Sequence, residues 1–297
     1  MDDNKLVYPT TFKNAELASA FHQRRYIQLK KLEYGTIILA SFIAIFPFNS
    51  TIDLHWPSLF SGLSLLVAVI VLFIEKSLEH HKGWYKSRAL AEAVKAESWK
   101  FRCGCGYYSK NKSEGDAIRG FLEYLSKIRS ELNINKSIAG HSTSGDEISQ
   151  EMKDSRNMSL EKRVALYKSF RVDDQIQWYS NKANTAVVKY RNYFIGAISC
   201  LLLGVIFAIA QFLGQLAQIS FVGFLSAIAL TLFGWMQIRR YETLSITYTN
   251  VVTELRSIAQ VLADTIQSEQ DLDISVRDAE LVISKEHTIW VTKGEVV

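Results

Sequence analysis

The chain has 297 residues, a net charge of +4, and only 3 prolines and 15 glycines. This composition favours long helices and argues against a fold rich in β-turns. Apolar residues make up 48% of the chain although its mean hydropathy is only +0.04, so they must be concentrated in blocks. The small basic excess does not indicate a nucleic-acid partner, because the placement of charge matters more than its sum.

Four apolar runs predict membrane-spanning helices, at about 34–48, 56–74, 193–210 and 219–238. A spanning helix needs about 20 apolar residues. The sequence therefore predicts an all-α membrane protein, in which four transmembrane helices form two hairpins and continue into a cytoplasmic bundle of long helices. The alternative is a soluble protein with buried hairpins. It is disfavoured because residues 192–238 contain no charge that would mark a face toward water.

The first run is shorter than a span requires. We expect it to recruit residues 29–33, with Lys30 and Lys31 extending toward the membrane surface. None of the four runs contains an aspartate, glutamate, lysine or arginine, which argues against a proton relay or a transporter ion site within the membrane.

The flanking charges predict the orientation. Basic segments precede the first and third runs ("QRRYIQLKK", "VVKYRNY") and follow the second and fourth ("EKSLEHHKGWYKSR", "QIRRYE"). The two short connections, "NSTIDLH" and "QFLGQLAQ", contain no lysine or arginine. By the positive-inside rule, both termini and the 75–192 region are cytoplasmic. The acidic start, "MDDNKLVYPTTF", does not resemble a secretory signal.

Small residues recur every four positions in the predicted spans. Such stripes allow helices to approach closely, either within one hairpin or between subunits. We expect the protein to self-associate through them. The stripes consist of Gly196, Cys200, Gly204 and Ala208 in one span, and Gly223 and Ala227 in the next.

The two halves share a layout in which a polar helix enters, a hairpin spans and a polar helix leaves, which suggests a repeated unit. We divide the chain into a first half (1–133), a Ser/Gly-rich linker (134–155) and a second half (156–297). Within these regions, 121–133 and 273–290 have the spacing of amphipathic helices.

Two predicted helices carry tryptophans and charges on the same face, where an ordinary amphipathic helix separates them. Counted from the membrane, the two stripes lie at matching depths, about 21 Å into the cytoplasm at 1.5 Å per residue. They consist of Trp84, Arg88, Glu92, Lys95 and Trp99 on the first helix, and Arg171, Asp174, Gln175, Trp178 and Lys182 on the second.

One interpretation of the stripes is a buried polar seam that also serves gating. It pairs Glu92 with Arg171 or Lys182, and Asp174 with Arg88 or Lys95. The other interpretation is a recognition surface, on which arginine and tryptophan bind a phosphate-bearing nucleotide.

No residues indicate catalysis, a metal site or a cofactor, and we expect the chain not to be an enzyme. Cys103, Cys105 and Cys200 cannot form a closed disulfide framework, and we expect the first two to be reduced thiols at the glycine-marked end of a helix. "GHSTSG" lacks the context of a nucleophile loop, and Glu286 with His287 does not make a zinc-protease motif.

Several segments resemble the SLATT family, two-transmembrane effector domains found beside nucleotide-second-messenger synthases and SLOG sensors in prokaryotes. "WYKSRALAEAVKAESWKFR" and "YPTTFKNAELASAFHQRRY" are similar to one SLATT type. "RNMSLEKRVALYKSFRVDDQIQWYSNKA" and the ending "ISKEHTIW" are similar to a second. The resemblance covers nearly the whole chain as a tandem pair, and it rests on patterns of Trp, Arg, Glu and Gln.

The resemblance implies a pore-forming or membrane-disrupting effector of antiviral defence in the bacterial inner membrane, as a multi-pass homo-oligomer. Its expected partners are the lipid bilayer and a nucleotide second messenger or a defence-system sensor protein, with no nucleic acid. Two alternatives stay open: a non-catalytic membrane sensor that binds a nucleotide or a partner protein, and a structural membrane scaffold.

Overall fold

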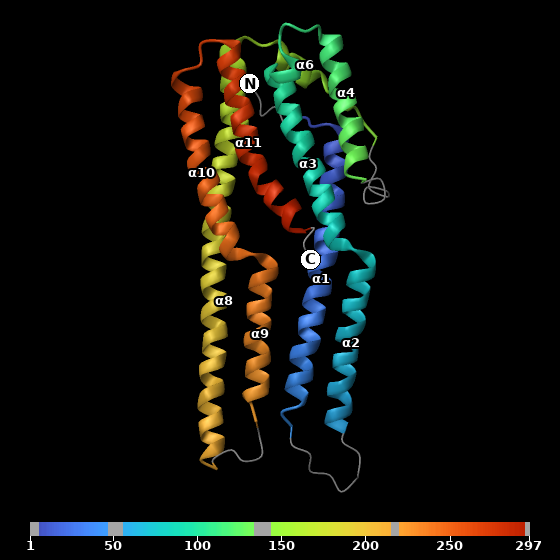
Figure 1. Cartoon of the computed structure of the whole chain (residues 1–297), viewed down its shortest axis with the longest axis vertical. Coiled ribbons are helices and arrows are strands. Elements are labelled where there is room, and N and C mark those ends of the chain that lie inside the picture. Colours follow the sequence, from blue (N-terminus) through green and yellow to red (C-terminus); the bar gives the residue numbers. More distant parts are fainter. Residues whose placement is uncertain (1–5, 47–55, 134–143, 215–219, 295–297) are drawn as a thin grey trace. The chain divides into compact units, whose positions relative to one another are not determined.

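The computed structural model describes residues 6–46, 56–133, 144–214 and 220–294, with side chains as far as Ser284 (Figure 1). Every regular element in these ranges is a helix, which confirms the all-α prediction. The helices are α1 (Thr10–Ile43), α2 (Trp56–Leu78), α3 (His80–Cys103), η1 (Gly106–Tyr108), α4 (Glu114–Glu131), α6 (Gln150–Asn157), α7 (Leu160–Tyr167), η2 (Lys168–Asp173), α8 (Asp174–Phe212), α9 (Val222–Arg239), α10 (Tyr241–Asp264) and α11 (Glu269–Gly294).

The chain forms two compact units. We call them the polar unit (1–23, 80–181 and 247–297) and the apolar unit (24–79 and 182–246). Helices α1 and α8 each contribute to both units, because both run without interruption from polar sequence into an apolar run.

The two halves repeat one backbone design. Each begins with a long entering helix, α1 or α8, and each outgoing helix, α3 or α10, is 24 residues long. Between span and outgoing helix stands a single residue in the left-handed conformation, Glu79 with φ 47° and Arg240 with φ 49°. A non-glycine residue adopts this conformation at a cost of about 1 to 2 kcal/mol.

Within the part of the chain that the structure describes, three helical stretches are long and apolar enough to cross a membrane, where the sequence predicted four spans. They begin at Trp56, Leu160 and Val222 and include α2, α8 and α9. The first predicted span is the exception, because helix α1 ends at Ile43 and residues 47 and 48 lie outside the described residues. Extending α1 backward to the length of a span brings in Lys30, Lys31 and Glu33, which is too much charge.

In the apolar unit, helices α1, α2, α8 and α9 pack against one another through small residues and aromatic rings. The Ser61 hydroxyl of α2 donates to the Ala40 carbonyl of α1 at 3.0 Å. A Cβ atom added at Gly234 of α9 would lie 2.7 Å from the Tyr34 hydroxyl of α1, so this contact requires glycine. Most large apolar side chains of these helices nevertheless remain exposed, as expected of a surface covered by lipid.

The small-residue stripe of α8 faces α9. A Cβ at Gly196 would contact Leu232 at 3.5 Å, and one at Gly204 would contact Leu225 at 3.9 Å. At Gly223, by contrast, nothing lies within 4 Å. The glycines of α8 therefore serve packing within their own hairpin.

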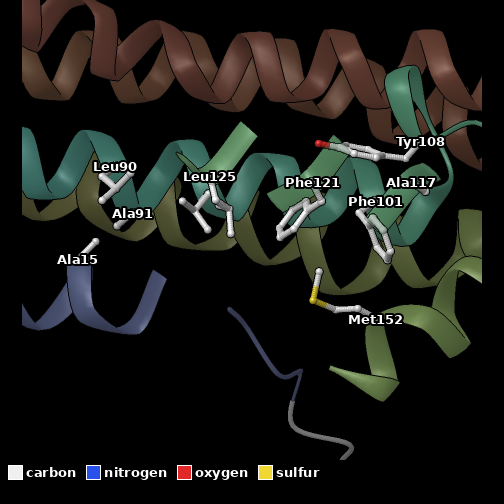
Figure 2. Close-up of a cluster of buried hydrophobic side chains, with 10 residues drawn as sticks. Ala15, Leu90, Ala91, Phe101, Tyr108, Ala117, Phe121, Leu125 and Met152 are labelled. Carbon is white, nitrogen blue, oxygen red and sulfur yellow. The ribbon is translucent and has the colours of Figure 1, made fainter. Parts of the chain in front are cut away.

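The polar unit has an apolar core along the middle and end of α3 (Figure 2). Leu90, Val94 and Phe101 of this helix belong to it, and the helix packs against α4 and α6. The core consists of Ala15, Leu90, Ala91, Val94, Phe101, Tyr108, Ala117, Phe121, Leu125 and Met152.

The end of α3 has the predicted glycine-marked cap. Gly104 and Gly106 have φ values of +66° and +58°, and the Cys105 amide donates to the Lys100 carbonyl at 2.9 Å. Cys103 and Cys105 are buried free thiols. The predicted helices at 121–133 and 273–290 correspond to parts of α4 and α11, and the predicted linker ends in α6.

Candidate functional site

Helix α3 is the centre of the polar unit, since it packs against α4, α6, α7 and α11. Around it lie four arginines with almost no exposed surface. Buried arginine requires partners, because an unpaired buried charge is strongly destabilising. The four are Arg102, Arg156, Arg163 and Arg171.

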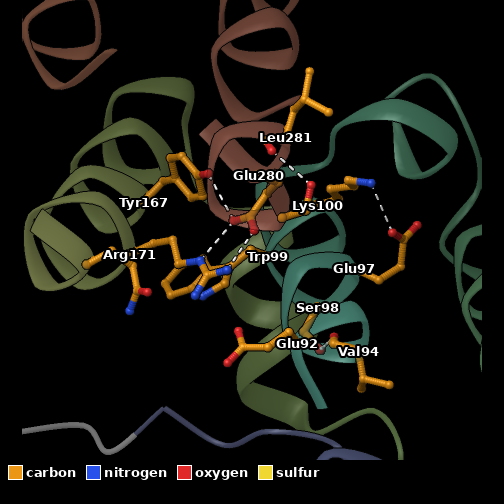
Figure 3. Close-up of polar contacts among 12 residues, drawn as sticks. Glu92, Val94, Glu97, Ser98, Trp99, Lys100, Tyr167, Arg171, Glu280 and Leu281 are labelled. Carbon is orange, nitrogen blue, oxygen red and sulfur yellow. Dashed lines mark hydrogen bonds and ion pairs between the residues drawn. The ribbon is translucent and has the colours of Figure 1, made fainter. Parts of the chain in front are cut away.

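Arg171 in η2 and Glu280 in α11 form a buried bidentate ion pair (Figure 3). The Arg171 Nε donates to Glu280 Oε1 at 2.9 Å, and Nη2 donates to Oε2 at 2.6 Å. The Tyr167 hydroxyl also donates to Oε1, at 3.0 Å. Because the side chains of Arg171 and Glu280 are 1% and 3% exposed, solvent screens this pair very little.

Two groups of this cluster, Arg171 and Tyr167, have pKa values above their usual ones. Burial acts to lower the pKa of Arg171, but the charge and hydrogen bonds of Glu280 outweigh burial and raise it above its usual value. Burial raises the pKa of the Tyr167 phenol well above its usual value, and the charge of Glu280 raises it further. Arg171 is therefore charged and the Tyr167 phenol neutral at physiological pH.

Arg102 in α3 binds both Val7, near the start of the chain, and Glu151 of α6. Its Nε and Nη2 donate to Glu151 at 3.2 and 2.8 Å, and Nη2 also donates to the Val7 carbonyl at 2.6 Å. The guanidinium lies 5.1 Å from the ring centroid of Tyr8 and 5.4 Å from that of Trp99. Burial acts to raise the pKa of Glu151, but its bonds and ion pair with Arg102 lower it.

Arg163 in α7 connects three segments. Its guanidinium forms a bidentate pair with Glu269 of α11 and donates to the Cys103 carbonyl at the end of α3. Arg156 of α6 instead donates to three backbone carbonyls beyond α3, at Tyr108, Ser109 and Lys112. Through these hydrogen bonds, the two arginines hold the end of α3 and the residues that follow it in place.

Two buried donors of this cluster, Arg102 Nη1 and Arg171 Nη1, have no hydrogen-bond partner among the described residues. An unsatisfied buried donor costs about 1 to 3 kcal/mol. Both arginines thus retain unused capacity to bind an acceptor.

The sequence-predicted stripes are partly buried. Trp99, Arg171 and Gln175 are buried. The half-buried residues are Trp84, Arg88, Glu92, Lys95 and Trp178, and the exposed ones are Asp174 and Lys182.

The structure gives Arg171 a different partner from the one proposed. Arg171 binds Glu280, whereas Glu92 has an ion pair with Arg88 on its own helix at 3.8 Å. Asp174 is exposed, and its expected pairing with Arg88 or Lys95 stays a prediction. Lys95 instead lies 5.7 Å from the ring centroid of Tyr8. Burial, and then the charge of Arg171, lower the pKa of Lys95.

Sequence reasoning missed Glu280, Glu151 and Arg163. A signal existed for Glu280, because it stands between Ala279 and Val282 and so on the apolar face of a helix, where a carboxylate needs a partner. Arg102, three residues after Trp99, continues the first stripe at helical spacing, but this pattern does not show that it is buried. No local pattern in the sequence marks Glu151, because its partner is 49 residues away.

Within the described ranges, no group of three or more His, Cys, Asp or Glu side chains is placed to hold a metal ion. His22 and His80 do meet, with their Nδ1 atoms 3.0 Å apart. The site is an array of fixed charges between helices.

These features define a helical membrane protein whose polar unit is held together by buried arginine–carboxylate pairs. Comparison with known families agrees. Residues 9–164 match the family described as SMODS and SLOG-associating 2TM effector domain 3, and residues 167–290 match domain 1 of the same name. The chain therefore belongs to the SLATT family, as a tandem of two such domains. Neither a curated protein nor a solved structure matches it.

Proposed function

We propose that the chain is an effector of prokaryotic antiviral defence that self-associates in the inner membrane and opens a pore or disrupts the bilayer. Membership of a family of two-transmembrane effector domains supports this proposal, as do the apolar helices α2, α8 and α9. In this proposal the polar unit and both termini are cytoplasmic, as the basic flanks of the apolar runs favour. The protein acts on the bilayer and performs no catalysis.

One observation carries the proposal. Helix α8 runs as a single helix from Asp174, three residues after the buried Arg171, to Phe212 at the end of an apolar run. At 1.5 Å per residue its 39 residues extend on the order of 60 Å. A continuous helix of this kind offers a path by which a rearrangement of the buried ion pairs could reach the span.

The test is dye release from lipid vesicles that contain the purified full-length chain, with and without candidate nucleotides. We expect release that increases with the protein-to-lipid ratio. Gly204→Leu should reduce it by forcing α8 away from Leu225, whereas Gly62→Leu should not, because nothing lies within 4 Å of Gly62. Inserted protein that releases no dye under any condition would overturn the proposal.

A second candidate is a non-catalytic sensor that binds a nucleotide or a partner protein through the polar unit. The unpartnered Nη1 atoms of Arg102 and Arg171 favour it, because a ligand oxygen could accept from them. Calorimetric titration of the full chain with nucleotides separates the two. Binding without dye release supports the sensor.

A further inference from the structure

Between α7 and α8 the helix contains one π-turn, η2, over Lys168–Asp173. A π-turn holds one residue more than the α-helix around it and is often found at functional sites. If this segment became a regular α-helix, one flanking helix would rotate relative to the other by about 100°, which is the rotation of one residue at 3.6 residues per turn. The turn therefore has two possible registers.

The two flanks of η2 differ in how they are held. Helix α7 is anchored to α3 and α11 through Arg163, which binds the Cys103 carbonyl and Glu269. Tyr167, the last residue of α7, binds Glu280. Helix α8 continues instead into the apolar run. A change of register at η2 would therefore rotate α8 against a fixed α7.

The exposure of neighbouring residues in η2 is the reverse of the usual pattern. Phe170 is 51% exposed, whereas Arg171 beside it is 1% exposed. A shift of one residue places Phe170 at the inward position of Arg171. Such a shift leaves Glu280 buried without Arg171 and with the Tyr167 hydroxyl as its partner, so the register seen here is the more stable one and a stimulus must drive the change.

A second carboxylate, that of Glu92, also lies near Arg171. In Figure 3 the Glu92 carboxylate extends from α3 on the side of the Arg171 guanidinium away from Glu280. Its charge helps to raise the pKa of Arg171, so the two groups interact across the gap. The unpartnered Nη1 of Arg171 leaves a donor for another acceptor.

A surface ion pair favours the π register selectively. Lys168 Nζ and Asp173 Oδ2 are 2.9 Å apart, and the two residues are five positions apart. A π-turn has hydrogen bonds between residues five positions apart, which brings such positions close together, whereas in an α-helix they point about 140° apart. The pair therefore favours the π register.

We infer that η2 is a register switch on the helix that enters the third predicted span: Arg171 is buried on Glu280 in the resting register, and Phe170 replaces it in the active register. In the active register Arg171 turns toward Glu92 and α8 rotates about its axis. The coupling of this rotation to membrane activity rests on the proposed function. The two registers themselves do not.

The test uses two variants of the full chain in lipid nanodiscs, with opposite expected effects. Asp173→Ala removes the pair that favours the π register and should raise amide hydrogen exchange over residues 168–174 by up to about fivefold. Phe170→Ser removes the residue that stabilises the active register and should lower exchange there. Glu161→Gln, on the exposed side of α7, is the control and should leave exchange unchanged.

Dye release provides the second readout. Asp173→Ala should increase release and Phe170→Ser should decrease it relative to the wild type. If both variants exchange and release like the wild type, η2 is not a switch. If exchange changes in the two expected directions while no protein releases dye, the switch stands and the proposed function fails. If the wild type releases dye and the variants change neither quantity, the switch alone is overturned.

Discussion

Helices α3 and α10 occupy the same place in the two halves of the chain, yet they pack differently. Each has 24 residues and follows one left-handed residue after a span. Helix α3 buries Arg102, Glu97 and two serines among its apolar residues, whereas the residues that α10 buries fully are apolar or tyrosine. In the same position of the repeat, α3 therefore buries charged and polar side chains, whereas α10 buries an ordinary apolar face. We call the buried polar residues of α3 and their partners the α3 hub.

The difference shows where the fold concentrates its specificity. An apolar face accepts many sequences of similar volume. Buried arginine pairs accept very few, since each depends on one partner in one position. Arg163, at the end of the first matched domain, pairs with Glu269 of the second and donates to the Cys103 carbonyl of α3, whereas Arg171 and Glu280 pair within the second domain. Charge therefore contributes to the contact between the two SLATT domains.

The largest effect is expected at the Arg171–Glu280 pair. Glu280→Ala should destabilise the polar unit by about 3 to 5 kcal/mol, because it leaves Arg171 buried without a counter-charge. Arg171→Met combined with Glu280→Leu should recover most of this loss. Thermal unfolding of the full chain in detergent, followed by circular dichroism, measures both. A loss below about 1 kcal/mol in the single variant would show that water reaches the pair.

For α10 we expect stability to depend on the volume of its buried apolar side chains and not on charge. Leu255 is fully buried, and Leu255→Ala should cost about 2 to 5 kcal/mol by leaving a cavity. Arg256→Gln on the exposed face should change stability by no more than about 0.5 kcal/mol. The same unfolding measurement applies. A large effect at Arg256 would mean that α10 also depends on charge, and the contrast with α3 would fail.

Acid should weaken the α3 hub through Glu151. Arg102 lowers the pKa of Glu151 below its ordinary value of 4.5, so the stabilisation is present above pH 4.5 and is lost as pH falls through the lowered value. Glu151→Gln should therefore reduce stability at pH 7 and flatten its decline below pH 4.5. Glu161→Gln serves as control. Parallel acid profiles for the wild type and Glu151→Gln would contradict this prediction.

The smallest effect is expected within the stripe that the sequence singled out. The Arg88 side chain is 35% exposed, and its pair with Glu92 joins neighbours on one helix. Arg88→Ala should cost about 0 to 1 kcal/mol. Comparison with Arg171→Ala under the same conditions should reveal a severalfold difference. Equal costs would place Arg88 in the same buried array as Arg171.

The sequence predicted the features that depend on long repeating patterns. Apolar runs without charge predicted α2, α8 and α9, and the matching order of elements predicted the tandem halves, to which the family matches correspond. The glycines after Cys103 and Cys105 predicted the end of α3. These features are local, so neighbouring residues contain the information.

The candidate site was harder to predict because its contacts join distant segments. Counting residues from the membrane brought the Arg171 and Glu92 helices to one depth, but depth alone does not determine which faces meet. It also ignored α11, the last helix, which supplies Glu269 and Glu280. The π-turn at η2 shifts every later face by one residue, and no composition rule predicts it.

The left-handed residues at Glu79 and Arg240 have a further consequence for how the chain tolerates change. Each resets the helical phase, so the lipid-facing pattern of α2 or α9 and the inward pattern of α3 or α10 need not continue one another. A residue inserted at either break is absorbed in the turn. In α8, which has no break between Asp174 and Phe212, the same insertion would turn everything beyond it by about 100°. The outgoing helices can therefore accept changes of length that the entering helix cannot.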